Sequence, residues 1–215
     1  PGIPGHFAST SYSTKAVDYV VEVFLQELSQ GMIMGFMKKT NIRAGIICVG
    51  NRDNRITATE EKLYRAAART AMRTGCPVLT QGAQMARKQV AMMTEEGLNS
   101  GRIIIGQCDR YPDIERDKEI AGKGAYVAYD SAAYDETPDP WRRRIESIKA
   151  MVDAGLQNHV VISVDAIGYA LGFPQPKRTY SYLLGEFLDS LRRAGIEEKT
   201  INMFLVENPR NVLSF

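Results

Sequence analysis

Short apolar runs alternate with amphipathic segments along the chain. Five runs have the form of buried strands, because each is too short for a free-standing helix and is bounded by glycine, proline or polar residues. They are Ala44–Val49, Pro77–Gln81, Arg102–Gln107, Ala125–Asp130 and His159–Asp165. Buried strands that alternate with amphipathic helices predict a parallel sheet in an α/β fold.

Each predicted strand carries a polar residue at or close to its carboxyl end. These residues are Cys48, Gln81, Gln107, Asp130 and Asp165. Ligands of parallel α/β sheets bind at this end of the strands, so the five positions form the candidate site. Arg110, with Arg52 and Arg55, is a candidate for binding an anionic substrate, although arginines of surface loops are usually solvated.

The segments between the strands carry helix signals. Thr57 and Glu60 fit a capping box that starts an alanine-rich helix ending at Thr74–Gly75. Further helices are expected from Ser13 or Thr14 to about Gln30, over Met85–Glu96, up to about Gly124, after Pro140 to Gly155, over Tyr180–Ala194 and over Glu197–Phe204. Methionines on one helix face are interpreted as core packing rather than as a soft binding surface.

Three irregular segments are expected. Pro1–Thr10 is a Gly/Pro-rich loop, Ser131–Pro140 is the longest irregular stretch, and Ala166–Arg178 is a loop that could act as a lid. Aromatic side chains of the last two are candidate pocket walls, with ordinary loop packing as the alternative. They are Tyr134, Tyr169 and Phe173.

Length, charge and cysteine content limit the classes of protein to which the chain can belong. The 215 residues suit a single domain over 1–215. A net charge of +2 with 24% charged residues predicts neither a nucleic-acid nor an anionic-membrane partner. No apolar run reaches the ~18 residues of a membrane span. Three scattered cysteines without CxxC spacing favour reduced thiols and a cytoplasmic location.

The number of strands limits the architecture. Five are too few for a closed (β/α)8 barrel, which typically needs ~250 residues. An open doubly wound sheet is the alternative, but the chain has neither of the glycine-rich phosphate-binding motifs that such folds usually carry in their first turn. The interpretation of the chain as part of a (β/α)8 barrel therefore remains possible.

Several segments resemble, in order and spacing, the phosphotriesterase family of the amidohydrolase superfamily. They are Ile42–Ile47 (IRAGII), Arg65–Arg69 (RAAAR), Gly75–Thr80 (GCPVLT), Glu95–Leu98 (EEGL), Arg102–Gly106 (RIIIG), Ile148–Gly155 (IKAMVDAG), Val160–Asp165 (VVISVD) and Glu207–Arg210 (ENPR). The resemblance implies a TIM-type (β/α)8 barrel, of which this chain holds about five of the eight βα units. It also implies a two-metal site that activates a hydroxide against phosphotriesters, lactones or related esters.

Carried over position by position, the resemblance finds most metal ligands substituted. The family's bridging lysine falls at Cys48, and the histidines that end its fifth and sixth strands fall at Gln81 and Gln107. The aspartate that ends the eighth strand is present as Asp165. The His-x-His pair of the first strand is not in this sequence.

Two proton-relay positions of some family members also differ. The carboxylate beyond the sixth strand falls near Arg110, with Asp109 beside it, and the relay histidine falls at Ser131, next to Asp130.

The substituted positions leave alternatives open. Asp165 is predicted to be a metal ligand and general base, or a carboxylate that caps a loop or pairs with an arginine. Cys48 is a candidate zinc ligand or a small buried thiol. Amide side chains replace imidazole poorly at zinc, so Gln81 and Gln107 are expected to bind substrate, together with Arg110 and Asp130.

Three functions follow as hypotheses. The first is a hydrolase of phosphotriesters, lactones or related esters with one divalent metal, zinc before others. The second is a metal-free, non-catalytic subunit of a heteromeric assembly. The third is a metal-free small-molecule binder or lyase. In each case a partner chain, a second copy or an N-terminal piece is expected to complete the barrel, because open edges of parallel strands expose unpaired backbone.

Overall fold

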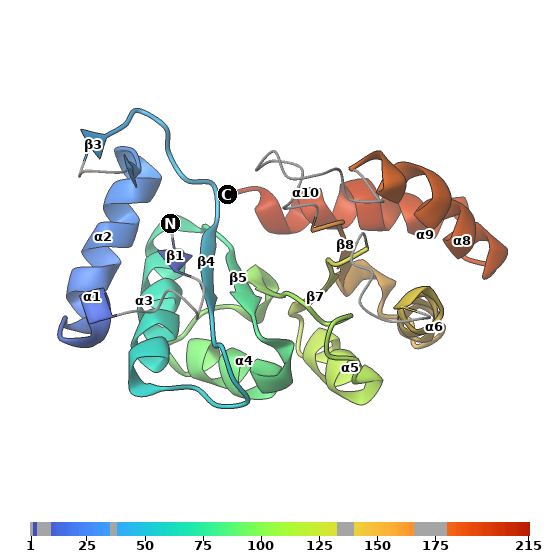
Figure 1. Cartoon of the computed structure of the whole chain (residues 1–215), viewed down its shortest axis with the longest axis horizontal. Coiled ribbons are helices and arrows are strands. Elements are labelled where there is room, and N and C mark those ends of the chain that lie inside the picture. Colours follow the sequence, from blue (N-terminus) through green and yellow to red (C-terminus); the bar gives the residue numbers. More distant parts are fainter. Residues whose placement is uncertain (1, 4–9, 35–37, 133–139, 166–179) are drawn as a thin grey trace. The chain divides into compact units, whose positions relative to one another are not determined.

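The fold is described by a computed structural model, which covers residues 2–3, 10–34, 38–132, 140–165 and 180–215 (Figure 1). The chain forms two compact units. Unit 1 comprises Pro1–Ile105 and Val212–Phe215, and unit 2 comprises Gly106–Asn211. The single domain expected over 1–215 stays a prediction.

Parallel strands form the centre of unit 1. Their order is β1 (Gly2–Ile3), β4 (Ile47–Gly50), β5 (Val78–Gln81) and β6 (Ile103–Ile105). All three residues of β6 are buried, as expected for the middle of an α/β fold. Strand β1 lies in the segment predicted to be a loop and pairs with Cys48 and Val49, so that prediction was wrong for its first residues. A two-residue strand leaves no hydrophobic period to detect.

Three helices carry apolar faces in unit 1. They are α2 (Val17–Ser29), α3 (Ala58–Thr74) and α4 (Ala86–Glu95), which follows the 3-10 turn Ala83–Met85. The capping box is confirmed, because Thr57 Oγ1 accepts the Glu60 N–H and Glu60 accepts the Thr57 N–H at 2.7 Å. The methionines Met92 and Met93 are buried, as the core-packing interpretation predicted.

The start of α2 differs from the prediction. Ser13 is the last residue of the short helix α1 (Thr10–Ser13), and Ala16 is the N-cap of α2, without a side-chain hydrogen bond. Lys62 Nζ donates to the carbonyls of Tyr12 and Ser13, at 3.1 and 2.9 Å. This contact with α3 holds the end of α1, and a long-range contact of this kind leaves no local signal in the sequence.

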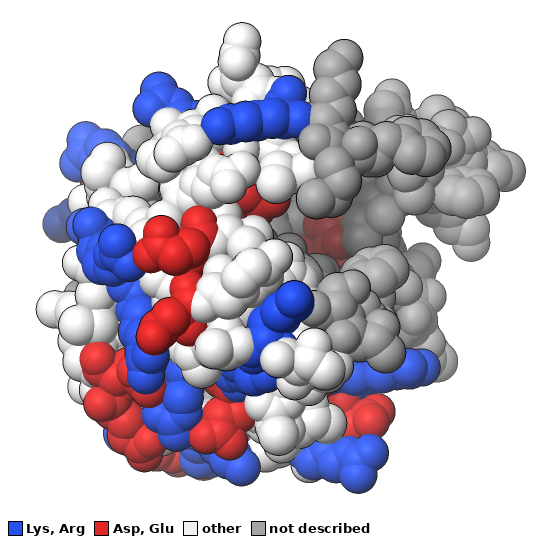
Figure 2. Space-filling view, turned by 90° about the vertical axis from the view of Figure 1, so that its left-hand side faces the viewer, with Lys and Arg blue, Asp and Glu red and all other residues white. Residues whose placement is uncertain are grey.

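Acidic and basic side chains alternate over the face that includes α2 and α3 (Figure 2). Arg69 pairs with Asp18 at 3.0 Å and with Glu96 at 2.7 Å, and Arg73 pairs with Glu22 at 3.0 Å. These pairs join neighbouring helices, and each includes at least one exposed or partly exposed partner. We therefore assign them small contributions to stability.

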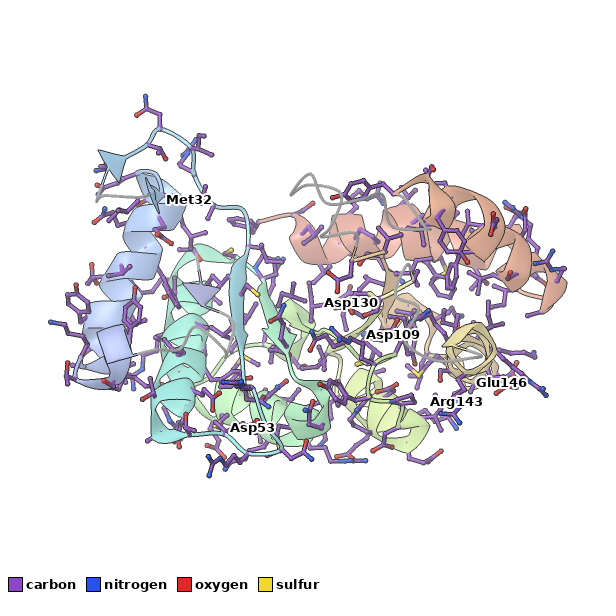
Figure 3. All side chains as sticks on the ribbon, in the orientation of Figure 1. Met32, Asp53, Asp109, Asp130, Arg143 and Glu146 are labelled. Atoms are coloured by element: carbon purple, nitrogen blue, oxygen red, sulfur yellow. The ribbon has the colours of Figure 1, made fainter. Side chains whose placement is uncertain are left out.

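A small antiparallel hairpin follows α2. It consists of β2 (Ile33–Met34) and β3 (Lys38–Lys39), and Thr40 Oγ1 donates to the Met32 carbonyl at 2.9 Å. Met32 lies at the base of this hairpin (Figure 3). The hairpin was not predicted from the sequence, because its paired residues are too few for a strand pattern.

Unit 2 is built on two parallel strands, β7 (Tyr126–Tyr129) and β8 (Val160–Ile162). The accompanying helices are α5 (Ile114–Gly122), α6 (Pro140–Asp153), α8 (Leu188–Arg193), α9 (Glu198–Asn202) and α10 (Asn208–Leu213), which begins in unit 2. π-Helical turns at Leu183–Phe187 and Met203–Glu207 interrupt the helices predicted near the C-terminus. The side-chain amide of Asn208 donates to the carbonyls of Gln157 and Val160, at 2.8 and 2.7 Å.

All five predicted strands are found, but they are shorter than predicted. Arg102 ends the 3-10 turn Ser100–Arg102 and His159 ends the 3-10 turn Gln157–His159, so both residues precede their strands. Most of the loops predicted at 131–140 and 166–178, with Tyr134, Tyr169 and Phe173, lies outside the described residues. Within the described part of the chain, no helix combines the length and apolarity needed to cross a membrane.

Candidate functional site

The candidate residues are divided between the two units. Cys48 and Gln81 belong to unit 1, whereas Gln107, Arg110, Asp130 and Asp165 belong to unit 2. Each group is therefore a partial site with its own geometry.

In unit 2 the segments that follow β6 and β7 hold one another through their carboxylates. The Gln107 N–H donates to both oxygens of Asp130, at 3.0 Å each. In return, the Ser131 N–H donates to Asp109 Oδ2 at 3.0 Å. Asp109 and Asp130 lie close together in Figure 3. We call this reciprocal arrangement of Gln107, Asp109, Asp130 and Ser131 the carboxylate clasp.

A buried arginine supports the clasp from α6. Arg144 Nε donates to the same Asp109 Oδ2 at 2.5 Å, and both side chains are almost fully buried, at 4% and 0% exposed. Asp109 Oδ1 and Arg144 Nη1 are also buried, and neither has a hydrogen-bond partner among the described residues. The pair therefore retains one acceptor and one donor that the surrounding described structure does not use.

Two carboxyl groups of the candidate site in unit 2 have raised pKa values. Burial raises the pKa of Asp130 to about 7, with further contributions from the charges of Asp109 and Asp165, while the Gln107 N–H opposes the increase. Burial also raises the pKa of Asp165, and the positive charge of Arg110 opposes that increase. A carboxyl group that changes charge near neutral pH, as Asp130 does, is suited to proton transfer.

The backbone is strained at two of the predicted site residues. Gln107 has φ 63° and Asp165 has φ 51°, and they are the non-glycine residues with positive φ in the described part of the chain. Left-handed conformations of ordinary residues are uncommon and concentrate at functional sites. Both residues follow parallel strands, β6 and β8.

Unit 1 places Cys48 and Gln81 differently. Cys48 is half-buried in the second position of β4, which continues to Gly50, so it does not end its strand as predicted. Gln81 is the last residue of β5 and is half-buried. Gly50 is the register partner of Gln81, and a Cβ at Gly50 would lie 2.9 Å from the Gln81 Cβ. The close approach of these strands therefore requires glycine at position 50.

A neutral hydrogen-bond network, which sequence reasoning missed, follows β4 and β5. The amide of Gln89 on α4 donates to Asn51 Oδ1 at 2.7 Å and to the carbonyls of Gln81 and Gly82, and it accepts from Thr80 at 2.8 Å. Tyr64 donates to the same Asn51 oxygen at 3.0 Å. All of these side chains are almost fully buried. We call Asn51, Tyr64, Thr80 and Gln89 the amide network.

The other predicted arginines do not join one group in the described structure. Arg52 and Arg55 are exposed in unit 1, and the Arg52 N–H donates to Glu60 at 3.1 Å. Arg110 lies in the turn after β6, where its N–H donates to the Gln107 carbonyl at 3.2 Å. Arg110 is therefore the arginine that the structure relates to a predicted site carboxylate.

The residues present do not fit the metal centre that the resemblance implies. Within the described residues, no group of three or more His, Cys, Asp or Glu side chains is arranged to hold a metal ion. Carboxamides stand at two histidine positions, Gln81 and Gln107, and the Asp130 oxygens already accept a backbone N–H. The roles of Asp165 and Cys48 as metal ligands stay predictions.

Comparisons with known proteins agree on the family and the fold. The model of the phosphotriesterase family matches residues 4–213. The phosphotriesterase homology protein of Escherichia coli K12 is 30% identical over 201 residues, which cover 92% of this chain and 66% of that protein. The phospho-furanose lactonase of Mycoplasmopsis synoviae is 32% identical over 216 residues, which cover 91% and 59%.

Solved structures give the same result. The crystal structure of the Escherichia coli phosphotriesterase homology protein, with phosphate in its active site, has a TM-score of 0.85 at 28% identity and covers 98% of this chain and 72% of its own. That of an amidohydrolase from Mycoplasma synoviae has a TM-score of 0.88 at 26% identity and covers 100% and 65%. The predicted fold class, part of a TIM-type (β/α)8 barrel, is confirmed. The chain spans less than two thirds of the length of both curated relatives.

Proposed function

Because the chain belongs to the phosphotriesterase family, we propose that its strand-end carboxylates serve the hydrolysis of a lactone, phosphotriester or related ester. The names of its relatives support this class, since they include a phospho-furanose lactonase and an aryldialkylphosphatase. A phosphate occupies the active site of the related Escherichia coli protein. An anionic or phosphorylated ester is therefore the substrate that we propose first.

The observation that carries this proposal is the pair Asp130 and Asp165. They follow the adjacent parallel strands β7 and β8, and the pKa of each carboxyl group is raised, that of Asp130 to about 7. Near neutral pH Asp130 can hold a proton. One carboxyl group can then act as a general acid while the other acts as a general base.

For a lactone we propose two proton transfers, one as the new bond forms and one as the ring opens. Asp165 accepts a proton from water as the water oxygen bonds to the carbonyl carbon. Asp130 donates a proton to the ring oxygen as the bond between that oxygen and the carbonyl carbon breaks. The product is a hydroxy acid, and proton exchange with solvent restores the pair. No step runs through a metal, because the donor set described above does not fit one.

Arg110 is proposed to bind the anionic group of the substrate. Its charge acts on Asp165, whose pKa it lowers against the effect of burial. An arginine close to the general base can hold a phosphate or carboxylate and keep part of the base ionised.

The test is hydrolysis of a panel of lactones and phosphotriesters by the chain, with and without added Zn²⁺ and with chelator. Asp165→Asn should reduce kcat/KM by about 100-fold or more, the usual contribution of a general base. Asp153→Asn removes an exposed carboxylate that pairs with Lys149 on α6, and it should leave the rate unchanged. Equal activity of Asp165→Asn and wild type would refute the assignment.

The non-catalytic subunit remains a second candidate, and the substitution of histidine by Gln81 and Gln107 favours it. The partner that completes the barrel is common to both candidates and is also a proposal. Strand β1 supports it, since among the described residues it pairs with β4 at two positions, Cys48 and Val49. Native mass spectrometry distinguishes the candidates: co-purification with a larger histidine-bearing homologue, together with no hydrolysis by this chain, would favour the subunit.

A further inference from the structure

We propose that Asp109 and Arg144 are positioning residues for Asp130. In this arrangement Arg144 fixes Asp109, Asp109 fixes the Ser131 N–H, and the resulting carboxylate clasp fixes the Asp130 carboxyl group against the Gln107 N–H. The inference rests on the proposed role of Asp130. It adds Arg144, which neither the family resemblance nor the strand-end pattern named, and it gives Asp109 a positioning role in place of the proton relay.

The first supporting feature is the reciprocity of the clasp. The two hydrogen bonds run in opposite directions between the same two segments, from Gln107 to Asp130 and from Ser131 to Asp109. Ser131 Oγ also donates to Asp130 Oδ1 at 3.3 Å. Movement of Ser131 therefore affects Asp130 directly, and Asp109 controls the position of Ser131.

The second supporting feature is the position of Arg144. Its side chain is 4% exposed and reaches Asp109 from α6, 35 residues along the chain. Burying a guanidinium is costly unless it is paired, so a surface ion pair on α6 would have been the cheaper arrangement. The neighbouring Arg143 is exposed, so an arginine on this helix does not have to be buried (Figure 3).

The third supporting feature is the unused hydrogen-bonding capacity of the pair. Asp109 Oδ1 and Arg144 Nη1 are buried without partners among the described residues. A purely structural ion pair gains most when every polar atom is satisfied, and an exception in a native structure calls for a functional explanation or an ordered water. The pair thus combines incomplete pairing with a position beside a proposed acid.

The charges around Asp130 determine what each variant should do. Among the described residues, Asp109 faces it from the segment after β6 and Asp165 from the segment after β8, and both raise its pKa. Arg144 acts on Asp109, and Arg110 acts on Asp165. Removing the charge of Asp109 should therefore lower the titration midpoint of Asp130.

The experiment follows Asp130 directly, by carboxyl ¹³C NMR titration of the full chain, with Asp130→Asn to assign the signal. Asp109→Asn keeps an oxygen for the Ser131 N–H but removes the charge, and it should lower the midpoint by about one pH unit. Arg144→Met should increase amide hydrogen exchange at Ser131 by at least about tenfold, equivalent to about 1.4 kcal/mol of lost protection. Arg144→Lys should restore most of that protection.

The matched control is Arg143→Met, which removes the same charge from the adjacent exposed position and should change neither measurement. Folded Asp109→Asn protein with an unchanged Asp130 midpoint would overturn the proposal, as would Arg144→Met protein with wild-type exchange at Ser131. If Arg144→Met does not fold, the Asp109→Asn titration alone decides. Failure of the wild type to hydrolyse any ester would overturn the proposed function and leave this result unaffected.

Discussion

The two units secure their strand ends by opposite means. In unit 1 the amide network after β4 and β5 contains only carboxamides and hydroxyls, and Gln89 alone makes four hydrogen bonds. In unit 2 the carboxylate clasp after β6 and β7 contains two carboxylates and is supported by the buried Arg144. Asp109 Oδ1 and Arg144 Nη1 have no hydrogen-bond partner among the described residues.

The difference predicts how each unit responds to mutation and to pH. A neutral, satisfied network stabilises a loop at any pH because no member changes charge. Buried carboxylates are costly when ionised, and their proton affinity then depends on their neighbours. We therefore expect unit 1 to respond to mutation through stability, and unit 2 through its dependence on pH.

The largest loss is expected from Gln89→Leu in the amide network. Leucine removes the acceptor of the buried Thr80 hydroxyl. It also removes one of the two hydrogen bonds accepted by Asn51 Oδ1 and by each of the carbonyls of Gln81 and Gly82. Together these losses should cost about 3 kcal/mol. Urea unfolding measures the change. Lys88→Leu, at the adjacent exposed position, is the control and should stay within about 0.5 kcal/mol. Equal losses for the two variants would show that the network is not a source of stability.

The next largest predicted effect is a gain in stability on replacing Asp130, and its size depends on pH. The pKa of Asp130 is raised from 3.8 to about 7, so the folded state keeps a proton that the unfolded chain releases in this interval. The stability contributed by this group is present below pH ~4 and is lost as the pH rises through ~7.

Asp130→Asn removes the loss of stability that wild type suffers as the pH rises. A pKa shift of this size corresponds to ~4 kcal/mol, and the partial exposure of Asp130 reduces it. Relative to wild type the variant should therefore gain about 2 kcal/mol in free energy of unfolding at pH 8 and almost nothing at pH 4. Thermal and urea unfolding across this pH range measure the difference, and Asp153→Asn controls for the change in net charge. A difference that is constant with pH would contradict the raised pKa.

A smaller loss is expected from Thr57→Ala in unit 1. It removes the capping box of α3, where Glu60 also accepts the Arg52 N–H from the loop after β4. The expected cost is about 1 kcal/mol, typical of an N-cap, and it should not vary with pH between 6 and 9. Thr59→Ala, two residues into the same helix, is the control. A loss no larger than that of the control would show that the cap is redundant.

The smallest effect is expected from Arg73→Ala. The ion pair of Arg73 with Glu22 is exposed on both sides, at 56% and 68%, and should contribute less than about 0.5 kcal/mol. Added salt should remove even this contribution. A loss above 1 kcal/mol in the unfolding free energy would mean that exposed arginine pairs rival the buried pair of Arg144, contrary to the comparison.

Local signals in the sequence were sufficient to predict much of the fold. The capping box at Thr57 and the glycine end of α3 depend on residues close in sequence, and the five strands follow from apolar runs that need no knowledge of partners. The short strands β1, β2 and β3 were missed, because two residues give no period and their formation depends on pairing.

The site was predicted less completely, for a related reason. Single strand-end residues such as Gln107 and Asp130 can be found by position, but a pair 35 residues apart such as Asp109 and Arg144 cannot. A weak signal existed for the arginine: Arg144 shares a helix face with Ile148 and Met151, both buried, so a charge lay on an apolar stripe. Gln89 likewise stands among the buried Ala86, Val90 and Met93.

The left-handed backbone at Gln107 and Asp165 has a consequence for directed evolution. Glycine adopts this conformation without the steric penalty that other residues meet, and a stability screen rewards the removal of such strain. A library selected only for heat resistance should therefore drift toward glycine at these two positions. A library selected for turnover should keep Asp165 and accept the strain, so the divergence between the two populations would reveal which constraint has maintained each side chain.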